Sequence, residues 1–313
     1  MKAPTNIFLD SMLEALFGAS PAAVSRVLAA FPNMRARLED PARSICARSV
    51  PCWDDLGAEV HTLRWPRRQR GHLIGWTASG SAWHSFQIVR PEFEKIARVQ
   101  TGPITVDLQD VDGFACSKSD LTQFTSTDEL VEANSRELIA QVSEQQLAKR
   151  LAHREVRIIH APGTDFFARY QWDTPVPRLW VMNSGGSHNL SAAKYIAARL
   201  SQRVALTGML RTYSLDAGAV ASLLADFEMF ALADDDLGSA AFHDAMKAVR
   251  ATWLTLPLPK PYESCRAVLL PRSEGRSMRV AQELRSAGVA DLGAHLAVLA
   301  DRGFHGDGRT VSG

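Results

Sequence analysis

Cysteine, net charge and long hydrophobic runs are all scarce in this sequence of 313 residues. The four cysteines are Cys46, Cys52, Cys116 and Cys265. No two of them have the two-residue spacing of a tetrahedral zinc site, so we expect reduced thiols. The formal net charge of +1 favours neither nucleic acid, nor an anionic membrane, nor an acidic partner.

The start of the chain also lacks the features of an export signal. Its apolar stretch is interrupted by Asp10 and Glu14, which makes it too short and too charged for a signal peptide or a membrane span. We therefore expect a cytoplasmic protein without a membrane partner.

Several catalytic motifs are missing as well. The histidines include no His-x-x-x-His pair, which argues against a zinc hydrolase. The segment 184–187 does not supply the Gly-x-Ser-x-Gly elbow of α/β hydrolases, and no Walker-type phosphate loop is present. These absences disfavour zinc hydrolases, serine hydrolases and P-loop nucleotidases.

Hydrophobic residues make up 46% of the chain, which is enough for one large domain or two ordinary ones. Short apolar runs and segments of helical spacing alternate, which predicts a mixed α/β (α+β) fold. Helices are expected at 5–17, from Pro21, and at 189–200, 216–232, 239–251, 274–286 and 290–302. A further helical region, capped by Ser126, is expected at 126–153, either continuous or restarted at Ser143. Strands are expected at 73–77, 83–89, 104–108, 156–160, 167–170, 178–182, 204–213, 253–257 and 265–270.

The order of these elements suggests three parts. Residues 1–99 combine helices with a β-hairpin, residues 100–232 form a central domain, and residues 233–313 form a C-terminal α/β portion packed on it. The oligomeric state cannot be read from these patterns.

The glycine turn at Asn183–Asn189 carries the clearest chemical signature. A strand that ends in Gly185-Gly186 and enters a helix leaves several backbone N–H groups pointing the same way, at the positive end of the helix dipole. The glycines allow positive φ and let an anion approach the backbone. Ser187 can either cap the helix or offer its hydroxyl to a ligand, and His188 lies in the first turn. The turn is therefore predicted to bind an anion.

The run Gly185-Gly186-Ser187-His188-Asn189, followed by Ala192-Ala193, resembles the Gly-x-His-Arg-x-x-Ala-Ala type motif of the ParB/sulfiredoxin-like superfamily. The order of strands and helices over residues 100–220 is also similar. In that family the motif holds nucleotide phosphates, and members include CTP-dependent partition proteins, ATP-dependent sulfiredoxins, a free-serine kinase and some nucleases. The resemblance implies a ParB/sulfiredoxin-like central domain that binds a nucleotide, ATP or CTP.

Two positions depart from the family pattern. The usual arginine is Asn189 here, which removes a bidentate phosphate contact. The catalytic cysteine of the sulfiredoxin branch would fall at Ser187, which argues against sulfinic acid repair. Phosphate binding remains compatible, with nucleotide hydrolysis, phosphotransfer or nuclease activity as possible reactions.

The candidate residues follow from the turn and from the strand at 104–108. Predicted ligands of the nucleotide are Gly185, Gly186, Ser187, His188, Asn189 and Lys194. Asp107 and Asp110 are predicted to hold a magnesium ion that bridges phosphates. His188 and Asp110 are the candidate catalytic residues.

Two other interpretations remain open. A Gly-Gly turn is also common in α/β proteins simply because the chain reverses there. Arg64, Arg67, Arg68 and Arg70 form a basic cluster that indicates nucleic-acid binding or, more plainly, a solvated loop. The alternative function is a non-catalytic DNA- or protein-binding regulator of a plasmid, phage or other mobile element.

Overall fold

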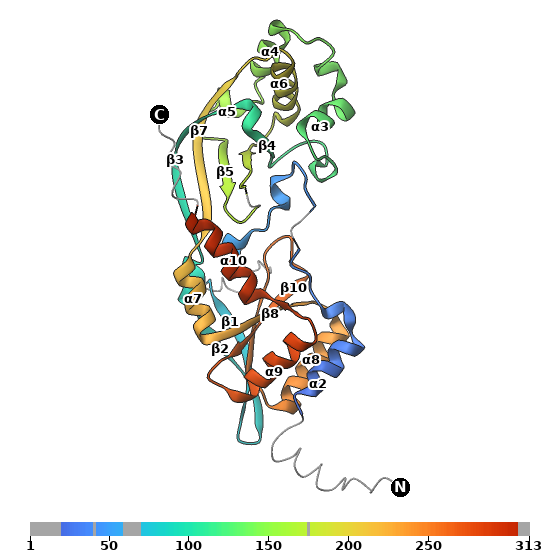
Figure 1. Cartoon of the computed structure of the whole chain (residues 1–313), viewed down its shortest axis with the longest axis vertical. Coiled ribbons are helices and arrows are strands. Elements are labelled where there is room, and N and C mark those ends of the chain that lie inside the picture. Colours follow the sequence, from blue (N-terminus) through green and yellow to red (C-terminus); the bar gives the residue numbers. More distant parts are fainter. Residues whose placement is uncertain (1–19, 40–41, 59–69, 174–175, 306–313) are drawn as a thin grey trace. The chain divides into compact units, whose positions relative to one another are not determined.

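The computed structural model describes residues 20–39, 42–58, 70–173 and 176–305 (Figure 1). They form two compact units. Unit 1 contains the chain up to Glu39, Asp55–Ile96 and Asp216–Asp301. Unit 2 contains Asp40–Asp54, Ala97–Leu215 and the chain from Arg302. Each unit has its own β-sheet with helices packed on it, so the chain is mixed α/β, as the sequence predicts.

Unit 1 is built on a six-stranded sheet in the order β11-β8-β10-β9-β1-β2, antiparallel throughout. Its strands are β1 (His72–Ser79), β2 (Ala82–Val89), β8 (Phe227–Ala233), β9 (Trp253–Pro257), β10 (Cys265–Pro271) and β11 (Ala290–Asp291). Its helices are α2 (Ala22–Ala30), α7 (Ala217–Asp226), α8 (Asp236–Val249), α9 (Gly275–Ser286) and α10 (Leu292–His305).

The pairing of β1 with β9 groups the segments differently from the predicted three-part division. The N-terminal hairpin and the C-terminal strands complete one sheet, because β1 and β2 extend the edge that β9 leaves open. Residues 216–232 also join this sheet rather than the central domain, since β8 pairs with β10 along seven residues.

Both faces of the unit 1 sheet are covered. Phe230 and Leu232 of β8 lie in one core cluster with residues of α2, α8 and α9. The alternate residue Met229 is also buried, and the first turn of α10 approaches it at Gly293. Unit 1 is therefore a three-layer arrangement of helices, sheet and helices.

Unit 2 is built on a five-stranded mixed sheet in the order β3-β7-β5-β6-β4. Its strands are β3 (Ala97–Asp107), β4 (Val111–Phe114), β5 (Phe166–Tyr170), β6 (Leu179–Met182) and β7 (Ala205–Leu215). Its helices are α3 (Thr127–Asn134), α4 (Glu144–Leu151), α5 (Arg157–His160) and α6 (Ser187–Arg199). The neighbours β4 and β6 are parallel, which matters for the site below.

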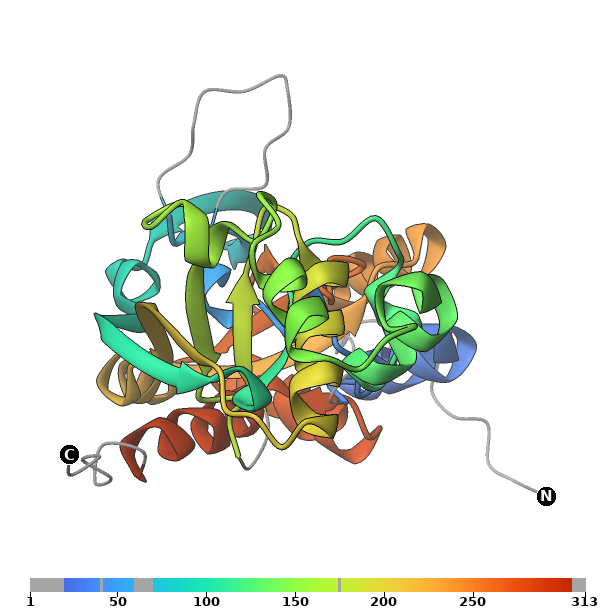
Figure 2. The same cartoon turned by 90° about the horizontal axis from the view of Figure 1, so that it is seen from above.

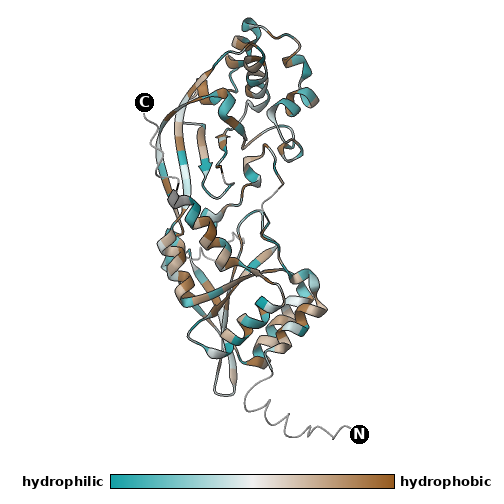
Figure 3. Ribbon diagram, viewed as in Figure 1, coloured by the Kyte–Doolittle hydropathy of each residue, from teal (hydrophilic) through white to brown (hydrophobic). Residues whose placement is uncertain are grey.

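The core of unit 2 lies between one face of this sheet and its helices. Leu190, Ile196 and Ala197 of α6 are buried in it together with Leu130 of α3 and Leu147 of α4. Figure 2 shows α4 beside α6, and Figure 3 shows that these helices carry both hydrophilic and hydrophobic residues. Such amphipathic helices bury one side against the sheet and leave the other to solvent.

Two predicted elements are wrong. The predicted strand 156–160 is instead the single-turn helix α5, which begins at Arg157 after its N-cap Val156. The N–H groups of His160 and Ala161 bond to carbonyls four residues earlier. The predicted helix 216–232 ends at Asp226, and β8 begins at the next residue. The predicted helix 5–17 lies outside the described residues.

Candidate functional site

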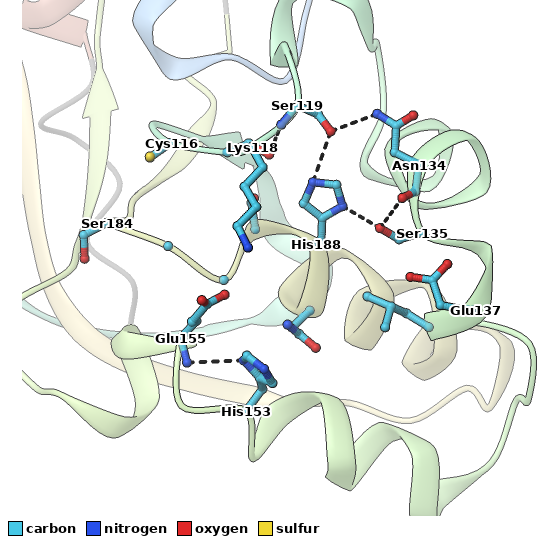
Figure 4. Close-up of a pocket in the computed structure, with 16 residues that line it drawn as sticks. Cys116, Lys118, Ser119, Asn134, Ser135, Glu137, His153, Glu155, Ser184 and His188 are labelled. Atoms are coloured by element: carbon cyan, nitrogen blue, oxygen red, sulfur yellow. Dashed lines mark hydrogen bonds between the residues drawn. The ribbon is translucent and has the colours of Figure 1, made fainter.

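A cavity of about 620 Å³ lies in unit 2 at the carboxyl ends of the parallel strands β4 and β6. It is lined by residues 116–119 after β4, 134–135 and 137–138 after α3, His153 and Glu155 after α4, and 184–189 after β6. The ends of parallel strands are a common place for ligands in α/β proteins, because the loops there surround a crevice. The predicted glycine turn forms one wall of this cavity (Figure 4).

The conformation of the turn requires a glycine at position 186. Gly186 has φ of +77°, in the left-handed region, and a Cβ atom there would lie 2.4 Å from the carbonyl oxygen of Glu155. At Gly185, by contrast, the nearest atoms to a Cβ would be 3.8 Å away, which is an ordinary contact. The two glycines therefore differ: position 186 excludes any side chain, and position 185 tolerates a small one.

Asn183 fastens the loop after β6 to the loop after β4. Its Oδ1 accepts the N–H groups of Ala115 and Cys116, both at 3.0 Å. Its Nδ2 donates to the carbonyls of Cys116 and Gly185, both at 2.8 Å. The buried amide thus uses two donors and two acceptor positions, which is its full capacity. This clamp fixes the cavity wall on both sides.

The first turn of α6 presents open donors to the cavity. Its N-cap is Gly186, which provides no side-chain cap, and the first bonded amide is that of Leu190, 2.9 Å from the Gly186 carbonyl. The N–H groups of Ser187, His188 and Asn189 have no acceptor among the described residues. Ser187 was predicted either to cap the helix or to offer its hydroxyl to a ligand, and it does not cap the helix. The backbone therefore offers three donors at the positive end of a 13-residue helix.

His188 is held by both of its ring nitrogens (Figure 4). Nδ1 lies 2.6 Å from the Ser135 hydroxyl, and Nε2 lies 3.2 Å from the Ser119 hydroxyl. Ser135 donates to the carbonyl of Asn134 at 2.7 Å, so it accepts from Nδ1. The side-chain amide of Asn134 donates to Ser119 at 2.8 Å, which leaves the Ser119 proton for Nε2. Histidine, serines and asparagine thereby close a ring of hydrogen bonds.

This ring of hydrogen bonds requires a neutral imidazole, because Nδ1 donates a proton and Nε2 accepts one. Burial lowers the pKa of His188 from its ordinary value of 6.5, and the nearby Lys118 ammonium lowers it further. The Glu137 carboxylate acts in the opposite direction with a smaller effect. At neutral pH, His188 thus joins the 117–119 loop to the end of α3, with neither nitrogen free to transfer a proton.

Two charged side chains enter the cavity from opposite sides. Figure 4 shows Lys118 reaching toward the glycine turn and Glu155 extending toward it from below. Among the described residues neither has an ion-pair partner within 4.0 Å, and the same holds for Glu137. Lys118 adds a cation beside the open amides, and the two glutamates add negative charge to the cavity lining, with Glu155 next to the glycine turn.

Lys194 is separated from the other predicted ligands. Its ammonium donates to the carbonyl of Val111, and it lines a second cavity of about 330 Å³ that also contains Asp112 and Asp128. The prediction that Lys194 joins the glycine turn is therefore wrong, because two helical turns place it about 10 Å further along α6, away from the helix N-terminus.

The carboxylates of Asp107 and Asp110 accept hydrogen bonds from backbone N–H groups. The Asp107 carboxylate accepts the Gln109 N–H at 3.0 Å, and the Asp110 carboxylate accepts the Asp107 N–H at 3.1 Å. These reciprocal bonds form a capping box at the 3-10 turn Leu108–Asp110. The Gln109 N–H, and then Arg203, lower the pKa of Asp107. Neither aspartate lines the cavity, so the pair does not fit the predicted magnesium site or a catalytic role for Asp110 there.

The part of the chain that the structure describes contains no group of three or more His, Cys, Asp or Glu side chains arranged to hold a metal. Of the predicted basic cluster, Arg64, Arg67 and Arg68 lie outside the described residues. Arg70 is described, and its guanidinium donates to the carbonyl of Leu56 at 3.3 Å.

Several site residues were not predicted from the sequence, namely Lys118, Ser119, Asn134, Ser135 and Glu155. The first two follow β4, a four-residue strand interrupted by Gly113 that gives almost no sequence signal. Had that strand been recognised, the polar run 116–120 at its end would have indicated the second loop of the site.

Comparisons with known proteins give one match. The family described as "Family of unknown function (DUF6685)" matches residues 103–306, a range that contains every residue of the cavity. No curated protein and no solved structure matches the chain. No helix in the described ranges is long and apolar enough to cross a membrane. Because the match extends over well more than half of its length, the chain belongs to the family of unknown function DUF6685.

Proposed function

We propose that the chain binds the phosphate group of a nucleotide or another small anion at the glycine turn. The observation that carries this proposal is the set of three open N–H groups at Ser187, His188 and Asn189, facing a cavity at the ends of two parallel strands. Buried or half-buried donors without acceptors are rare, and an anion at a helix N-terminus satisfies them.

The size and charge of the cavity support this proposal. A volume of about 620 Å³ lies within the range of small-molecule sites, which is about 300–1,000 Å³. Lys118 places a cation next to the amides, where it can pair with a phosphate oxygen. The resemblance to the ParB/sulfiredoxin-like superfamily implies the same ligand class, so ATP and CTP are the nucleotides to test first.

For hydrolysis or phosphotransfer, which the same resemblance implies, a proton acceptor is needed beside the phosphate. Glu155 is the better candidate than His188, because it has no ion-pair partner in the described chain and extends into the cavity. The two nitrogens of His188 are already used by Ser119 and Ser135. We therefore propose that His188 positions the two loops and that Glu155 takes the proton.

Thermal unfolding of the full chain with inorganic phosphate, ATP or CTP, each with and without Mg²⁺, tests the binding proposal. At a ligand concentration about 100 times Kd, the expected stabilisation is about 2.7 kcal/mol. Lys118→Gln should reduce the shift, because it removes the cation in the cavity. Lys149→Gln, an exposed lysine on α4 outside the cavity, is the matched control and should leave the shift unchanged. Absence of a shift with every ligand at millimolar concentration would refute the proposal.

A further inference from the structure

Arg150, near the end of α4, is a buried cation without a counter-charge. Its residue is only 8% exposed, yet no carboxylate of the described chain lies within 4.0 Å of its guanidinium. Its Nε has no hydrogen-bond partner. Its one recorded hydrogen bond runs from Nη1 to the Oδ1 of Asn189, at 3.3 Å. Asn189 lines the cavity and belongs to the first turn of α6.

This arrangement is unfavourable for the protein alone. A buried arginine is usually paired with a carboxylate, because removing a charge from water is costly unless an opposite charge compensates it. Here the neighbouring element is the N-terminus of α6, which itself carries a partial positive charge. Two positive centres therefore lie next to each other, and Lys118 adds a third on the cavity side.

A bound anion would supply the negative charge that the protein does not place near Arg150. We propose that the cavity selects a doubly negative phosphate group and that Arg150 supplies this selectivity through Asn189; this inference rests on the proposed function. Arg150 holds the Oδ1 of Asn189, so the amide is fixed with its Nδ2 donors uncommitted to any described acceptor. Because the Oδ1 of this amide accepts a hydrogen bond from a cation, its Nδ2–H groups are polarised and bind an anion more strongly. Arg150 acts as a positioning residue, since it does not line the cavity itself.

The charge balance distinguishes a phosphate from a carboxylate. An anion with one negative charge would compensate only one of the two cations, Arg150 and Lys118. A dianion compensates both cations and occupies the three amides as well.

The test measures the ligand-free melting temperature and the anion affinity of the full chain together. Arg150→Met removes the unpaired charge, so we expect the ligand-free melting temperature to rise by about 3 °C. The affinity for inorganic phosphate should fall about tenfold. Arg150→Lys should keep much of the affinity, and Arg154→Met, at an exposed arginine four residues on, should change neither value.

The probes separate the possible ligands. In mildly alkaline buffer, where inorganic phosphate is mainly the dianion, phosphate and sulfate should both stabilise the wild-type chain, whereas acetate at the same concentration should not. ATP or CTP binding much more tightly than inorganic phosphate would identify a nucleotide as the source of the phosphate group. Equal affinities would identify free phosphate.

Two results would overturn the inference. One is a lower ligand-free melting temperature, or failure to fold, for both Arg150→Met and Arg150→Gln, which would make Arg150 a structural residue. The other is wild-type phosphate binding that Arg150→Met leaves unchanged. A wild-type chain that responds to no anion would instead refute the proposed function, while the melting temperature of Arg150→Met would still report on the unpaired charge.

Discussion

The first turns of α4 and α6 lie in the same unit and use serine differently. Ser143 precedes α4, and its hydroxyl accepts the N–H of Gln146 at 3.2 Å, so that helix is capped by its own sequence. In α6 the serine is Ser187, one position inside the helix, and the N-cap is Gly186. Ser187 is buried, and its hydroxyl makes no hydrogen bond within the described chain.

The two serines illustrate a wider difference between polar groups that are bonded within the protein and polar groups that remain available to a ligand. The second cavity, around Lys194, is also polar, but Lys194 bonds to Val111 and Asp112 accepts the N–H of Leu179 at 2.8 Å. At the first turn of α6 the donors remain open. Both cavities are lined by polar side chains, but only the cavity at α6 also has N–H donors that no acceptor in the described chain satisfies.

The largest expected loss of stability comes from a substitution in the turn at which α6 begins. Gly186→Val combines a positive φ with a Cβ atom 2.4 Å from the Glu155 carbonyl, so the free energy of unfolding should fall by about 3 kcal/mol. Urea denaturation measures this loss. Gly185→Ala is the control and should change stability little, because its Cβ meets nothing closer than 3.8 Å. Equal losses in the two variants would contradict the difference between the glycines.

A smaller effect compares the two serines directly. Ser143→Ala removes a cap and should lower the free energy of unfolding by about 1 kcal/mol, without changing phosphate binding. Ser187→Ala removes no cap, so its cost should stay below about 0.5 kcal/mol. The phosphate-induced melting shift should nevertheless shrink in Ser187→Ala, because the hydroxyl lines the cavity. Denaturation and thermal shift together distinguish the two serines; a cap-sized loss in Ser187→Ala would refute the contrast.

The smallest effect concerns pH. Because the folded pKa of His188 is lowered, the unfolded chain binds the proton more readily than the folded chain does. Its contribution to stability is therefore complete above pH 6.5, falls as the pH drops through that value, and levels off below the folded pKa. Melting temperatures between pH 7.5 and 5 should show this fall, and His188→Gln should reduce it. His160→Gln, at an exposed histidine of the same unit, is the control; an unchanged fall in His188→Gln would reject the assignment.

Local signals made much of the fold predictable. The hairpin of β1 and β2, the caps at Ser126 and Ser143, and the helix after Gly186 all follow from short sequence patterns. Strand β8 was missed because both of its faces are buried, so its residues show no alternation that separates a strand from a buried helix. In 156–160, the alternating burial of Val156 and Ile158 imitates a strand within a single helical turn.

The site was predictable only in part, for a related reason. The glycine turn is a local feature, and the sequence identified it together with His188. The partners of His188 come from segments more than 50 residues away along the chain, since Ser135 and Ser119 are 53 and 69 residues distant. The parallel pairing of β4 with β6 brings the loop of Ser119 to His188, and the packing of α3 on α6 brings Ser135. Arg150 likewise becomes informative only once its burial and its missing partner are known.

The amide of Asn183 makes the shape of the cavity depend on a single side chain. Aspartate at this position would present a second oxygen to the carbonyls of Cys116 and Gly185, and leucine would make none of the four hydrogen bonds of this amide. No other residue type has the same outline and the same order of donors and acceptors. We therefore expect a chain of this family that lacks this asparagine, or the glycine three positions later, to have a differently shaped cavity.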